Sequence, residues 1–314
     1  MSTTQAPALR EGITRLLNQV RGMAPMRTAV VHPCDALSLA GALDARDAGV
    51  IAPVLVAPRA KLEHLAQEGG LNLGGCEIVD VPHSHAAAAA AAQLAGRGEV
   101  QALMKGSLHT DEYLAAVLAP EAGLRTERRL SHCYVMQTPS YPRPFLITDA
   151  AINIAPTLVD KADIIRNAIA LAQVLGVALP KVAILAAVET VNPRMPATLD
   201  AAALCKMADR GQITGGVLDG PLAFDNAVSP EAAQVKGIIS PVAGQADVLV
   251  VPDLESGNML AKQLEYLGGA ESAGIVMGAR VSLVLTSRSD SRATRLASCA
   301  IARLLASRWQ TAPR

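Results

Sequence analysis

The sequence predicts an α/β protein of two domains, and three observations support this fold class. Helix-like and strand-like patterns alternate along the chain about every 25 residues, which is the rhythm of βαβ units. The strand-like runs are continuously apolar, as in a sheet that is covered by helices on both faces. The chain has 314 residues, which suits two domains or one large α/β unit better than one ordinary core.

The first 120 residues are predicted to alternate regularly between helix and strand. Apolar residues recur at helical spacing between Leu9 and Val20, so a helix is expected there. Strands are expected at residues 28–31, 50–56, 77–81 and 102–104. Helices are expected at residues 36–48, 61–68, 84–96 and 110–118. Because a helix follows each strand, the strands can pair in parallel.

Residues 129–148 break this rhythm. Two apolar runs, 130–136 and 145–148, flank a turn that contains Pro139, Pro142 and Pro144. Because no helix separates these runs, they are predicted to form an antiparallel pair. The segment is also the expected passage from one domain to the next.

The βα alternation resumes after Asp149. Helices are expected at residues 161–175, 199–210, 230–235 and 256–267. Strands are expected at residues 182–187, 217–218, 247–251, 275–277 and 283–285. The closing helix carries an apolar face that begins at Ala293 and ends at Leu305.

The composition excludes several functional classes. Hydrophobic residues make up 51% of the chain and charged residues 18%, so a buried core is expected and a disordered protein is not. The many alanines indicate helices that approach closely. Aromatic residues are only 2%, which argues against stacking platforms for single-stranded nucleic acid. The formal net charge is zero, so no extended polyanion-binding surface is expected, although one or two arginines suffice for a small phosphate.

The five cysteines lie far apart and form no C-x-x-C motif. They indicate reduced thiols in a cytoplasmic protein and neither a disulfide framework nor a zinc site. The N-terminus lacks the pattern of a signal peptide, and no run of about 18 uncharged apolar residues predicts a membrane span.

The segment that follows the last strand combines several polar groups. An apolar run stops at Thr286, and Ser287, Arg288 and Asp290 follow before a helix pattern begins. Because the N–H groups at a helix start also favour anions, this corner can hold a phosphate-like group and place a base beside it. The alternative is that Ser289, Asp290 or Ser291 only caps the helix. The segment lies at the carboxyl end of a predicted strand, and this position favours a ligand site over simple capping.

A second candidate loop follows the strand at 102–104. Gly106 permits close approach of the backbone, and Lys105 can meet an anion. The spacing is not that of a P-loop, and an exposed βα loop is the alternative. His32 and His109 also lie at strand ends and are further, less specific candidates for a functional role.

A third candidate loop contains Asp253, Gly257 and Asn258. Gly257 and Asn258 can bring backbone and amide groups to a ligand. Alternatively, Asp253 only orients the loop and Ser256 caps the following helix.

Five segments, taken together and in this order, resemble the phosphate acetyltransferase / phosphate butyryltransferase family. They read KGSLHT (105–110), ITDAAIN (147–153), LDGP (218–221), VPDLESGNM (251–259) and LTSRSDS (285–291). The chain also resembles the acyltransferase part of bifunctional enoyl-CoA hydratase/phosphate acetyltransferase proteins, although it leaves no room for a hydratase domain.

The resemblance implies two α/β domains with a cleft between them, similar to the isocitrate/isopropylmalate dehydrogenase fold. The first domain would be discontinuous, at residues 1–140 and 282–314, and the second would span residues 141–281. A homodimer is usual in the family. The implied reaction moves an acyl group between coenzyme A and inorganic phosphate without a metal or redox cofactor, and nucleic acids and membranes are not expected partners.

The resemblance also implies site residues. Ser287, Arg288 and Asp290 would be catalytic: Arg288 would grip phosphate oxygens with its planar fork, Ser287 would hydrogen-bond the intermediate or the thiol, and Asp290 would act as base. The implied substrate-binding residues are Lys105, Gly106, His109, Thr110, Asp149, Asn153, Asp253, Gly257 and Asn258.

The sequence departs from the acetyl-specific pattern at two positions. The base aspartate expected seven residues beyond Ser287 is replaced by Thr294, and a basic residue is replaced near Tyr266. Asp290 is the substitute that occurs in the butyryl-like pattern. Acetyl is the first choice of acyl group and butyryl or another short acyl group the second. A catalytically silent CoA-binding regulator is the alternative from another functional class. An NAD-linked dehydrogenase is disfavoured, because the nicotinamide fingerprint and a cluster of metal-binding carboxylates are missing.

Overall fold

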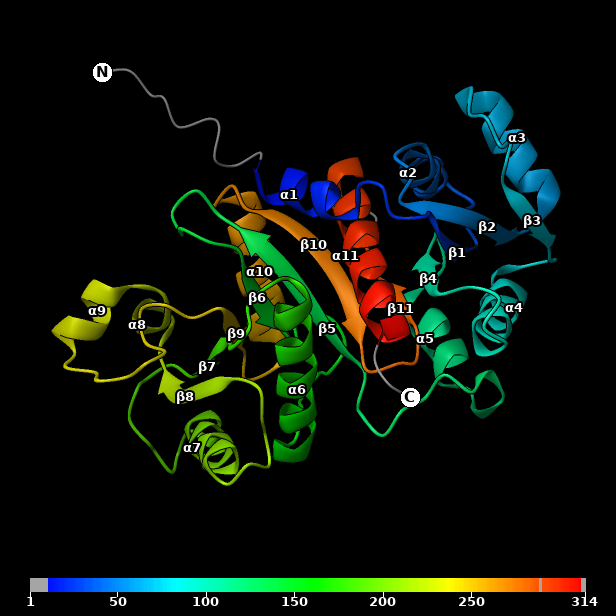
Figure 1. Ribbon diagram of the computed structural model, residues 1–314. Coiled ribbons are helices and arrows are strands. Elements are labelled where there is room, and N and C mark those ends of the chain that lie inside the picture. The colour runs from blue at the N-terminus through cyan, green and yellow to red at the C-terminus, as the bar shows by residue number, and fades with distance from the viewer. Residues whose placement is uncertain (1–10, 288–289, 312–314) are drawn as a thin grey trace, which may run out of the picture. The chain divides into compact units, whose positions relative to one another are not determined.

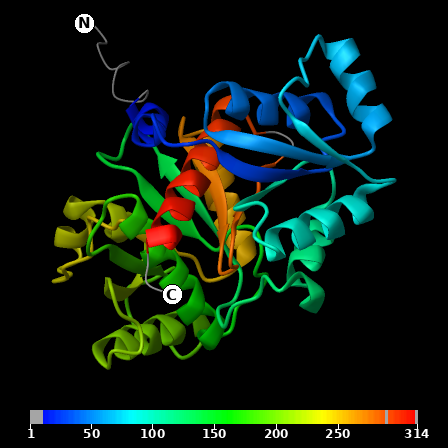
Figure 2. The same cartoon turned by 45° about the vertical axis from the view of Figure 1, so that its right-hand side comes forward.

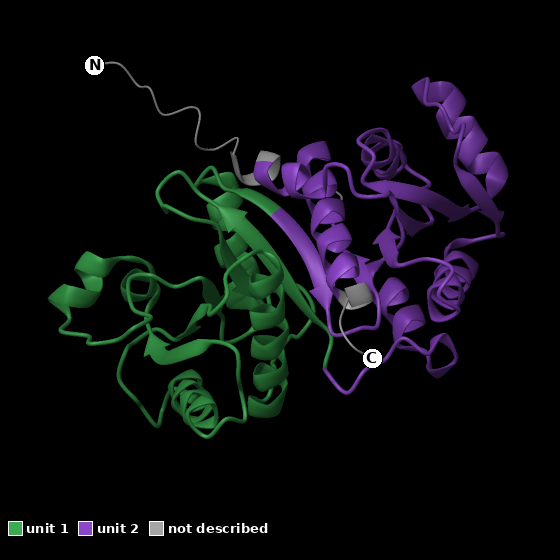
Figure 3. Ribbon diagram, viewed as in Figure 1, with its two compact units in different colours: residues 1–12, 129–272 green, residues 13–128, 273–314 purple. Residues whose placement is uncertain are grey.

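A computed structural model describes residues 11–287 and 290–311 of the chain (Figure 1). It divides into two compact units, which Figure 3 colours separately. Unit 1 consists of Arg129–Ser272 with the stretch up to Gly12, and unit 2 consists of Ile13–Arg128 and Ala273–Arg314. The domain boundaries predicted from the sequence, after residues 140 and 281, lie further along the chain than these changes of unit. They remain a prediction.

Unit 2 contains the first βα repeats and the C-terminal helix. Its strands are β1 (Met26–Val31), β2 (Ile51–Ala57), β3 (Glu77–Asp80), β4 (Ala102–Lys105), β11 (Ser282–Val284) and most of β10 (Glu271–Met277). Its helices are α2 (Ala36–Asp47), α3 (Arg59–Gly69), α4 (Ser84–Gly96), α5 (Thr110–Leu118), α11 (Arg292–Thr311), most of α1 (Glu11–Val20) and the short 3₁₀ turn Pro120–Ala122. Each predicted element of this region forms, with ends that differ by a few residues.

The strands of unit 2 follow the order β3-β2-β1-β4-β11-β10. The first five run parallel, and β10 is antiparallel to β11. The chain leaves β1 toward β2 and β3 and then returns to the other side of β1 to form β4. The carboxyl ends of β1 and β4 therefore flank a topological switch point, where open α/β sheets bind ligands.

Helices cover both faces of this sheet. α2 packs against α11, and α4 packs against α5. Figures 1 and 2 show α2 and α4 on opposite sides of β1 and β2. Small residues let helices approach closely, as the alanine content predicts. At the contact of α2 with α11, a Cβ atom on Gly41 would lie 2.7 Å from Cδ of Arg295.

Unit 1 contains the central part of the chain. Its strands are β5 (Ser131–Gln137), β6 (Phe145–Thr148), β7 (Lys181–Leu185), β8 (Val217–Leu222) and β9 (Val248–Val250). Its helices are α6 (Leu158–Val174), α7 (Pro196–Asp209), α8 (Phe224–Val228), α9 (Pro230–Val235) and α10 (Leu254–Tyr266). The strand order is β5-β6-β9-β7-β8, with β5 and β6 antiparallel, as predicted, and the other pairs parallel.

The structure differs from the sequence prediction for unit 1 at β8, at α8 and at the starts of α6, α7 and α10, of which α6 and α7 each begin three residues earlier than expected. A short strand was expected to end before Asp219 and Gly220, but β8 continues through both residues. The pairing of β7 with β8 shifts register between Ala183 and Leu185 of β7, and this irregularity lets the strand continue. Helix α8 was not predicted, since its five residues are too few to show a periodic pattern. Helix α10 begins at Leu254 and is capped by Asp253, two residues earlier than expected.

The helices in residues 11–287 and 290–311 all lack the combination of length and apolar character that a bilayer crossing needs.

Candidate functional site

Three adjacent strands of unit 2 bring the first group of predicted site residues to one edge of the sheet. Val31 of β1 is paired with Lys105 of β4, and Met104 of β4 is paired with Val284 of β11. Because parallel strands end on the same side, the loops after β1, β4 and β11 emerge together. The sequence placed the Lys105 and Ser287 loops each directly after a strand, and the strand order brings those strand ends side by side.

The backbone at the end of β1 lies so close to position 106 that only a residue without a side chain fits there. A Cβ atom at this position would overlap the carbonyl oxygen of Val31 and lie 2.6 Å from that of His32. The absence of a side chain lets Gly106 N–H donate to Val31 O over 2.9 Å and Ser107 N–H donate to His32 O over 3.0 Å. The glycine therefore extends the pairing of β1 and β4 beyond the last strand residue.

The other residues of this loop differ in exposure. Lys105 is buried at the end of β4, with 5% of its surface exposed. His109 occupies the N-cap position of α5, where its side chain makes no capping hydrogen bond, and Thr110 is the first residue of the helix. The next two residues are Asp111 and Glu112, which suit the positive end of the helix dipole.

A tight turn follows β11. Ser287 N–H donates to Asp290 Oδ2 over 2.7 Å, and Asp290 N–H donates to Ser287 O over 3.2 Å. The carboxylate of Asp290, which the sequence predicted as a base, therefore also stabilises the backbone at Ser287. Ser291 caps α11, because its Oγ accepts a hydrogen bond from Thr294 N over 3.0 Å. Arg288, like Ser289, lies outside the described residues.

Sequence reasoning missed Arg295, which supports this turn from α11. Its Nη1 donates to Thr286 Oγ1 over 3.0 Å and its Nη2 donates to Ser287 O over 2.8 Å. Arg295 is only 3% exposed, and α11 is buried on most sides, whereas Ala293 of the predicted apolar face is exposed. No signal in the sequence marks Arg295, because arginine is ordinarily a surface residue.

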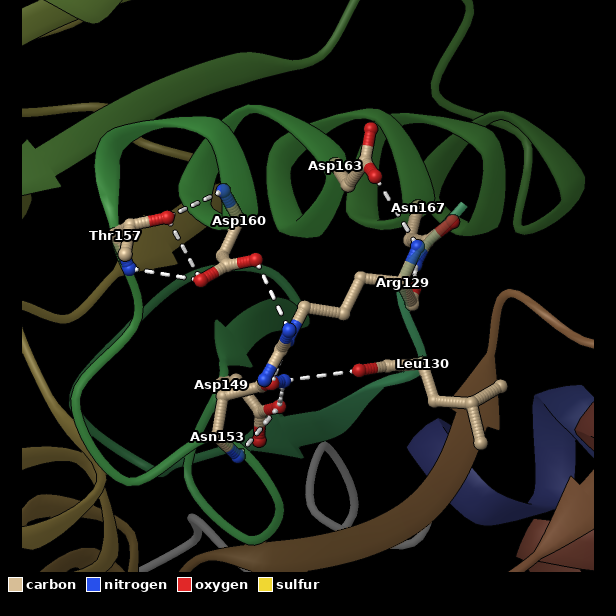
Figure 4. Close-up of polar contacts among 8 residues, drawn as sticks. All are labelled: Arg129, Leu130, Asp149, Asn153, Thr157, Asp160, Asp163 and Asn167. Atoms are coloured by element: carbon tan, nitrogen blue, oxygen red, sulfur yellow. Dashed lines mark hydrogen bonds and ion pairs between the residues drawn. The ribbon is translucent and has the colours of Figure 1, made fainter. Parts of the chain in front are cut away.

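A second group of predicted residues lies in unit 1 (Figure 4). Asp149 follows β6, and its Oδ1 accepts from Ala151 N over 2.9 Å and from Ile152 N over 3.0 Å. Its Oδ2 accepts from Nδ2 of Asn153 over 2.5 Å. Asn153 Nδ2 also donates to Leu130 O over 2.9 Å. Because both side chains are almost fully buried, this network fixes the conformation of the loop.

Arg129 joins this network, although the sequence did not single it out. Its Nε donates to Asn153 Oδ1, and its Nη1 lies 3.1 Å from Asp160 Oδ1 (Figure 4). Asp160 also forms a capping box with Thr157 at the start of α6. Burial acts to raise the pKa of Asp160, but the hydrogen bonds from Thr157 and the charge of Arg129 outweigh it and hold that pKa below its usual value.

Gly257 and Asn258 of α10 contact the loop that follows β6. β6 and β9 are parallel neighbours, so the segments after Thr148 and Val250 emerge together. Asn258 Nδ2 donates to Ala150 O over 3.1 Å. A Cβ atom on Gly257 would lie 2.6 Å from Cγ2 of Val251 and 3.0 Å from Cβ of Ala150, so the glycine allows α10 to pack on this loop.

Asp253, and not Ser256 as the alternative interpretation of the sequence expected, caps α10. Its Oδ1 accepts from Ser256 N over 2.8 Å and from Ser256 Oγ over 2.7 Å, so it caps α10. The five predicted residues of unit 1 thus form one cluster, and most of the hydrogen bonds described for them hold the backbone of the loop in place. Within the described ranges, no three His, Cys, Asp or Glu side chains lie together in a way that could hold a metal ion.

The chain is similar to known proteins over most of its length. A family model for "Phosphate acetyl/butaryl transferase" matches residues 83–303. A phosphate acetyltransferase of Rhizobium meliloti is 59% identical over 306 residues, which cover 98% of this chain and 97% of that protein. A phosphate butyryltransferase of Clostridium acetobutylicum is 40% identical over 296 residues, 94% of this chain and 98% of that protein.

A solved structure with a similar fold is that of a branched-chain phosphotransacylase from Enterococcus faecalis V583. The superposition has a TM-score of 0.78 at 32% sequence identity and covers 89% of this chain and 99% of that one.

Proposed function

We propose that this chain, which belongs to the phosphate acetyl/butyryl transferase family, moves a short acyl group between coenzyme A and inorganic phosphate. The observation that carries the proposal is 59% identity to a phosphate acetyltransferase along nearly the whole of both chains. Because a butyryltransferase is only 40% identical, acetyl is the favoured acyl group and butyryl the second candidate.

The reaction needs an activated nucleophile and a held leaving group. When coenzyme A attacks an acyl phosphate, its sulfur bonds to the carbonyl carbon and the bond from that carbon to the phosphate oxygen breaks. The thiol must lose its proton to attack, and the negative charge that develops on oxygen must be stabilised. The acyl group passes directly, and no covalent intermediate on the enzyme is required.

Ser287 and Arg288 are the groups proposed to contact the reacting atoms. The structure supports this role for Ser287 by its place at the carboxyl edge of the sheet, in a turn braced by Arg295. Arg288 is proposed as the two-pronged phosphate ligand on the basis of the sequence resemblance. The nine residues proposed to bind substrate, from Lys105 to Asn258, stay proposals in the same way.

Asp290 has two competing roles. It is the predicted base for the thiol, and it also accepts the hydrogen bond from Ser287 N that closes the turn. If Asp290 is the base, Asp290→Asn lowers the turnover rate with little loss of CoA binding. A fully active Asp290→Asn variant would place the base elsewhere.

The direct test is release of free thiol from acetyl-CoA on addition of phosphate. A transferase gives a signal that depends on phosphate, whereas a silent CoA-binding regulator binds CoA and gives none. Arg288→Ala is expected to cripple turnover and raise the phosphate requirement with the fold retained. A series of acyl-CoA substrates, from acetyl to butyryl, identifies the preferred chain length.

We also propose a cytoplasmic homodimer whose two domains form a cleft of the isocitrate/isopropylmalate dehydrogenase type. These features follow from the resemblance. Light scattering of the purified protein tests the dimer, since a monomer at assay concentrations would contradict it.

A further inference from the structure

The loop after β1 carries a histidine in an unusual backbone conformation. Within the described part of the chain, His32 is the only non-glycine residue with a positive φ, at 52°. A residue with a side chain adopts this conformation at a cost, and such residues cluster where function requires them. The neighbouring strands hold the backbone from both sides, because His32 N–H donates to Val56 O over 2.9 Å and its carbonyl accepts from Ser107 N over 3.0 Å.

Ser107 Oγ contacts both the backbone and the ring of His32. Ser107 Oγ donates to the carbonyl oxygen of His32 over 2.8 Å, and it also lies 3.1 Å from His32 Nδ1. With the hydroxyl proton directed at the carbonyl, the ring is the donor in the Nδ1 contact, and this is the tautomer that the proposal below assigns. The neutral ring then carries its lone pair on Nε2, which makes that atom a proton acceptor.

The surroundings favour the neutral form of the ring. Burial lowers the pKa of His32 below its ordinary value of 6.5, and the charge of Lys61 on α3 lowers it further. Glu112 on α5 and Asp35 at the start of α2 act in the opposite direction, and His83 at the start of α4 lowers the pKa slightly. The net effect leaves Nε2 able to take a proton at neutral pH.

His32 lies on the same edge as Ser287. β1 and β11 flank β4, so the carboxyl ends of these two strands are two strand spacings apart, about 10 Å. His32 directly follows β1 and Ser287 lies three residues beyond β11, so both loops start beside the end of β4. This is also the topological switch point of unit 2.

The usual carboxylate base is not in place here. Thr294 stands where the resemblance expects it, and its hydroxyl lies 3.1 Å from Ser291 Oγ. Asp290, the substitute, accepts a hydrogen bond from Ser287 N at its Oδ2 over 2.7 Å, so one of its oxygens is engaged in holding the turn.

We propose that His32 accepts the proton of the coenzyme A thiol at Nε2, and that Ser107 is the positioning residue that holds the ring for it. This inference rests on the proposed transferase function. As sulfur bonds to the carbonyl carbon, the electron pair of the broken C–O bond leaves on phosphate, and the proton passes from sulfur to Nε2 and then to that phosphate. In the reverse direction the phosphate proton passes through Nε2 to the departing thiolate.

The test compares wild type with His32→Asn in the reaction of acetyl phosphate with coenzyme A between pH 5 and pH 9. Asparagine tolerates a positive φ and keeps a donor near the Nδ1 position, but it has no group at Nε2. We expect kcat to fall about 10²- to 10⁴-fold. In wild type, kcat/KM falls as the pH drops through a value below 6.5, and in His32→Asn this inflection is absent.

Two further variants separate catalysis from structure. Ser107→Ala should lose less activity than His32→Asn and keep the inflection, because the ring remains but is held less firmly. His64→Asn, at an exposed histidine of α3, should match wild type. Wild-type kcat and an unchanged inflection in His32→Asn would overturn the inference.

A measurement on the wild type covers the case in which His32→Asn fails to fold. The ¹⁵N spectrum of histidine-labelled protein should show His32 with its proton on Nδ1 at neutral pH, and a proton on Nε2 would overturn the inference. If wild type itself gives no phosphate-dependent thiol release from acetyl-CoA, the proposed function fails. If wild type is active and only the His32 results disagree, the inference alone fails.

Discussion

Arg295 Nη2 donates a hydrogen bond of 2.8 Å to the carbonyl oxygen of Ser287, so a buried guanidinium supports the backbone that presents this serine. Ser287 precedes α11, and Arg295 lies in the first turn of that helix. A buried cation at this place also adds positive charge beside the turn, which suits a site for an anion. The relationship makes Arg295 a positioning residue for the proposed active site.

Loss of Arg295 should destabilise the protein. Arg295→Met keeps much of the side-chain volume but leaves Thr286 Oγ1 and Ser287 O without this donor, which costs about 1–3 kcal/mol of unfolding free energy. Urea unfolding measures the change. Arg303→Met is the matched control on the same helix, because the Arg303 bond to Ala24 O is exposed and its loss should cost less.

Thr286→Val tests whether the Arg295 contact itself carries the effect. In a double-mutant cycle the two substitutions should couple by about 0.5–3 kcal/mol, since they remove the same hydrogen bond. Additive effects would assign the cost of Arg295→Met to packing alone.

Gly106→Ala should disturb the pairing of β1 and β4. The new Cβ atom would lie 2.6 Å from the carbonyl oxygen of His32 and nearer still to that of Val31, so backbone has to move. We expect a loss of about 1–3 kcal/mol in unfolding free energy, together with reduced transferase activity. Gly69→Ala is the control, because its Cβ would meet only the Leu71 side chain at 3.3 Å, and its effect should stay within about 1 kcal/mol.

The capping box of α6 should contribute to stability in a manner that depends on pH. Because the pKa of Asp160 is held below its usual value of 3.8, its stabilising contribution is present above that pH and is lost as the pH falls through the lower folded-state value. Asp160→Asn should therefore be less stable than wild type at pH 6, and this difference should shrink as the solution is acidified below pH 3.8. A difference that stays constant with pH would contradict the assigned charge contribution.

Thr157→Ala removes the other half of the same capping box. The loss of the hydroxyl that accepts from Asp160 N should cost about 1 kcal/mol, measured by urea unfolding at neutral pH. No change in stability would show that α6 is held by its packing alone.

The cysteines should differ in reactivity. Burial raises the pKa of both Cys133 and Cys299 to about 12, so the thiolate fraction at pH 8 is about 1 in 10⁴ for each. Cys34, Cys76 and Cys205 are partly buried, but burial raises the pKa of Cys34 and raises that of Cys205 to about 12, so Cys76 should react first with a disulfide reagent. All five thiols should react in urea. Cys76→Ser should remove the early phase in the native protein, and rapid labelling of Cys299 would contradict the described burial.

Much of the fold follows from patterns that are local in the sequence. Continuous apolar runs and helical spacing predicted nearly every strand and helix, and the proline-rich turn at 139–144 predicted the antiparallel pair β5 and β6. Where a segment was short or irregular, as in α8 and β8, local spacing failed because tertiary pairing decides such elements.

The candidate site was predictable only in part. Lys105-Gly106 and Ser287 could be found because polar residues that end apolar runs collect at one edge of a parallel sheet. Arg129, Arg295 and the arrangement of His32 with Ser107 were not predictable, since each depends on residues that are distant in the chain.

The sequence by itself determined the alternation of helices and strands, the strand ends that carry polar residues and the family to which the chain belongs. Only the tertiary structure decided which strand lies beside which, and therefore that His32 meets Ser107 and that Arg295 braces Ser287. The physical reason is that periodicity and turn chemistry act over a few residues. Hydrogen bonds between side chains 75 residues apart form only when the sheet has been assembled.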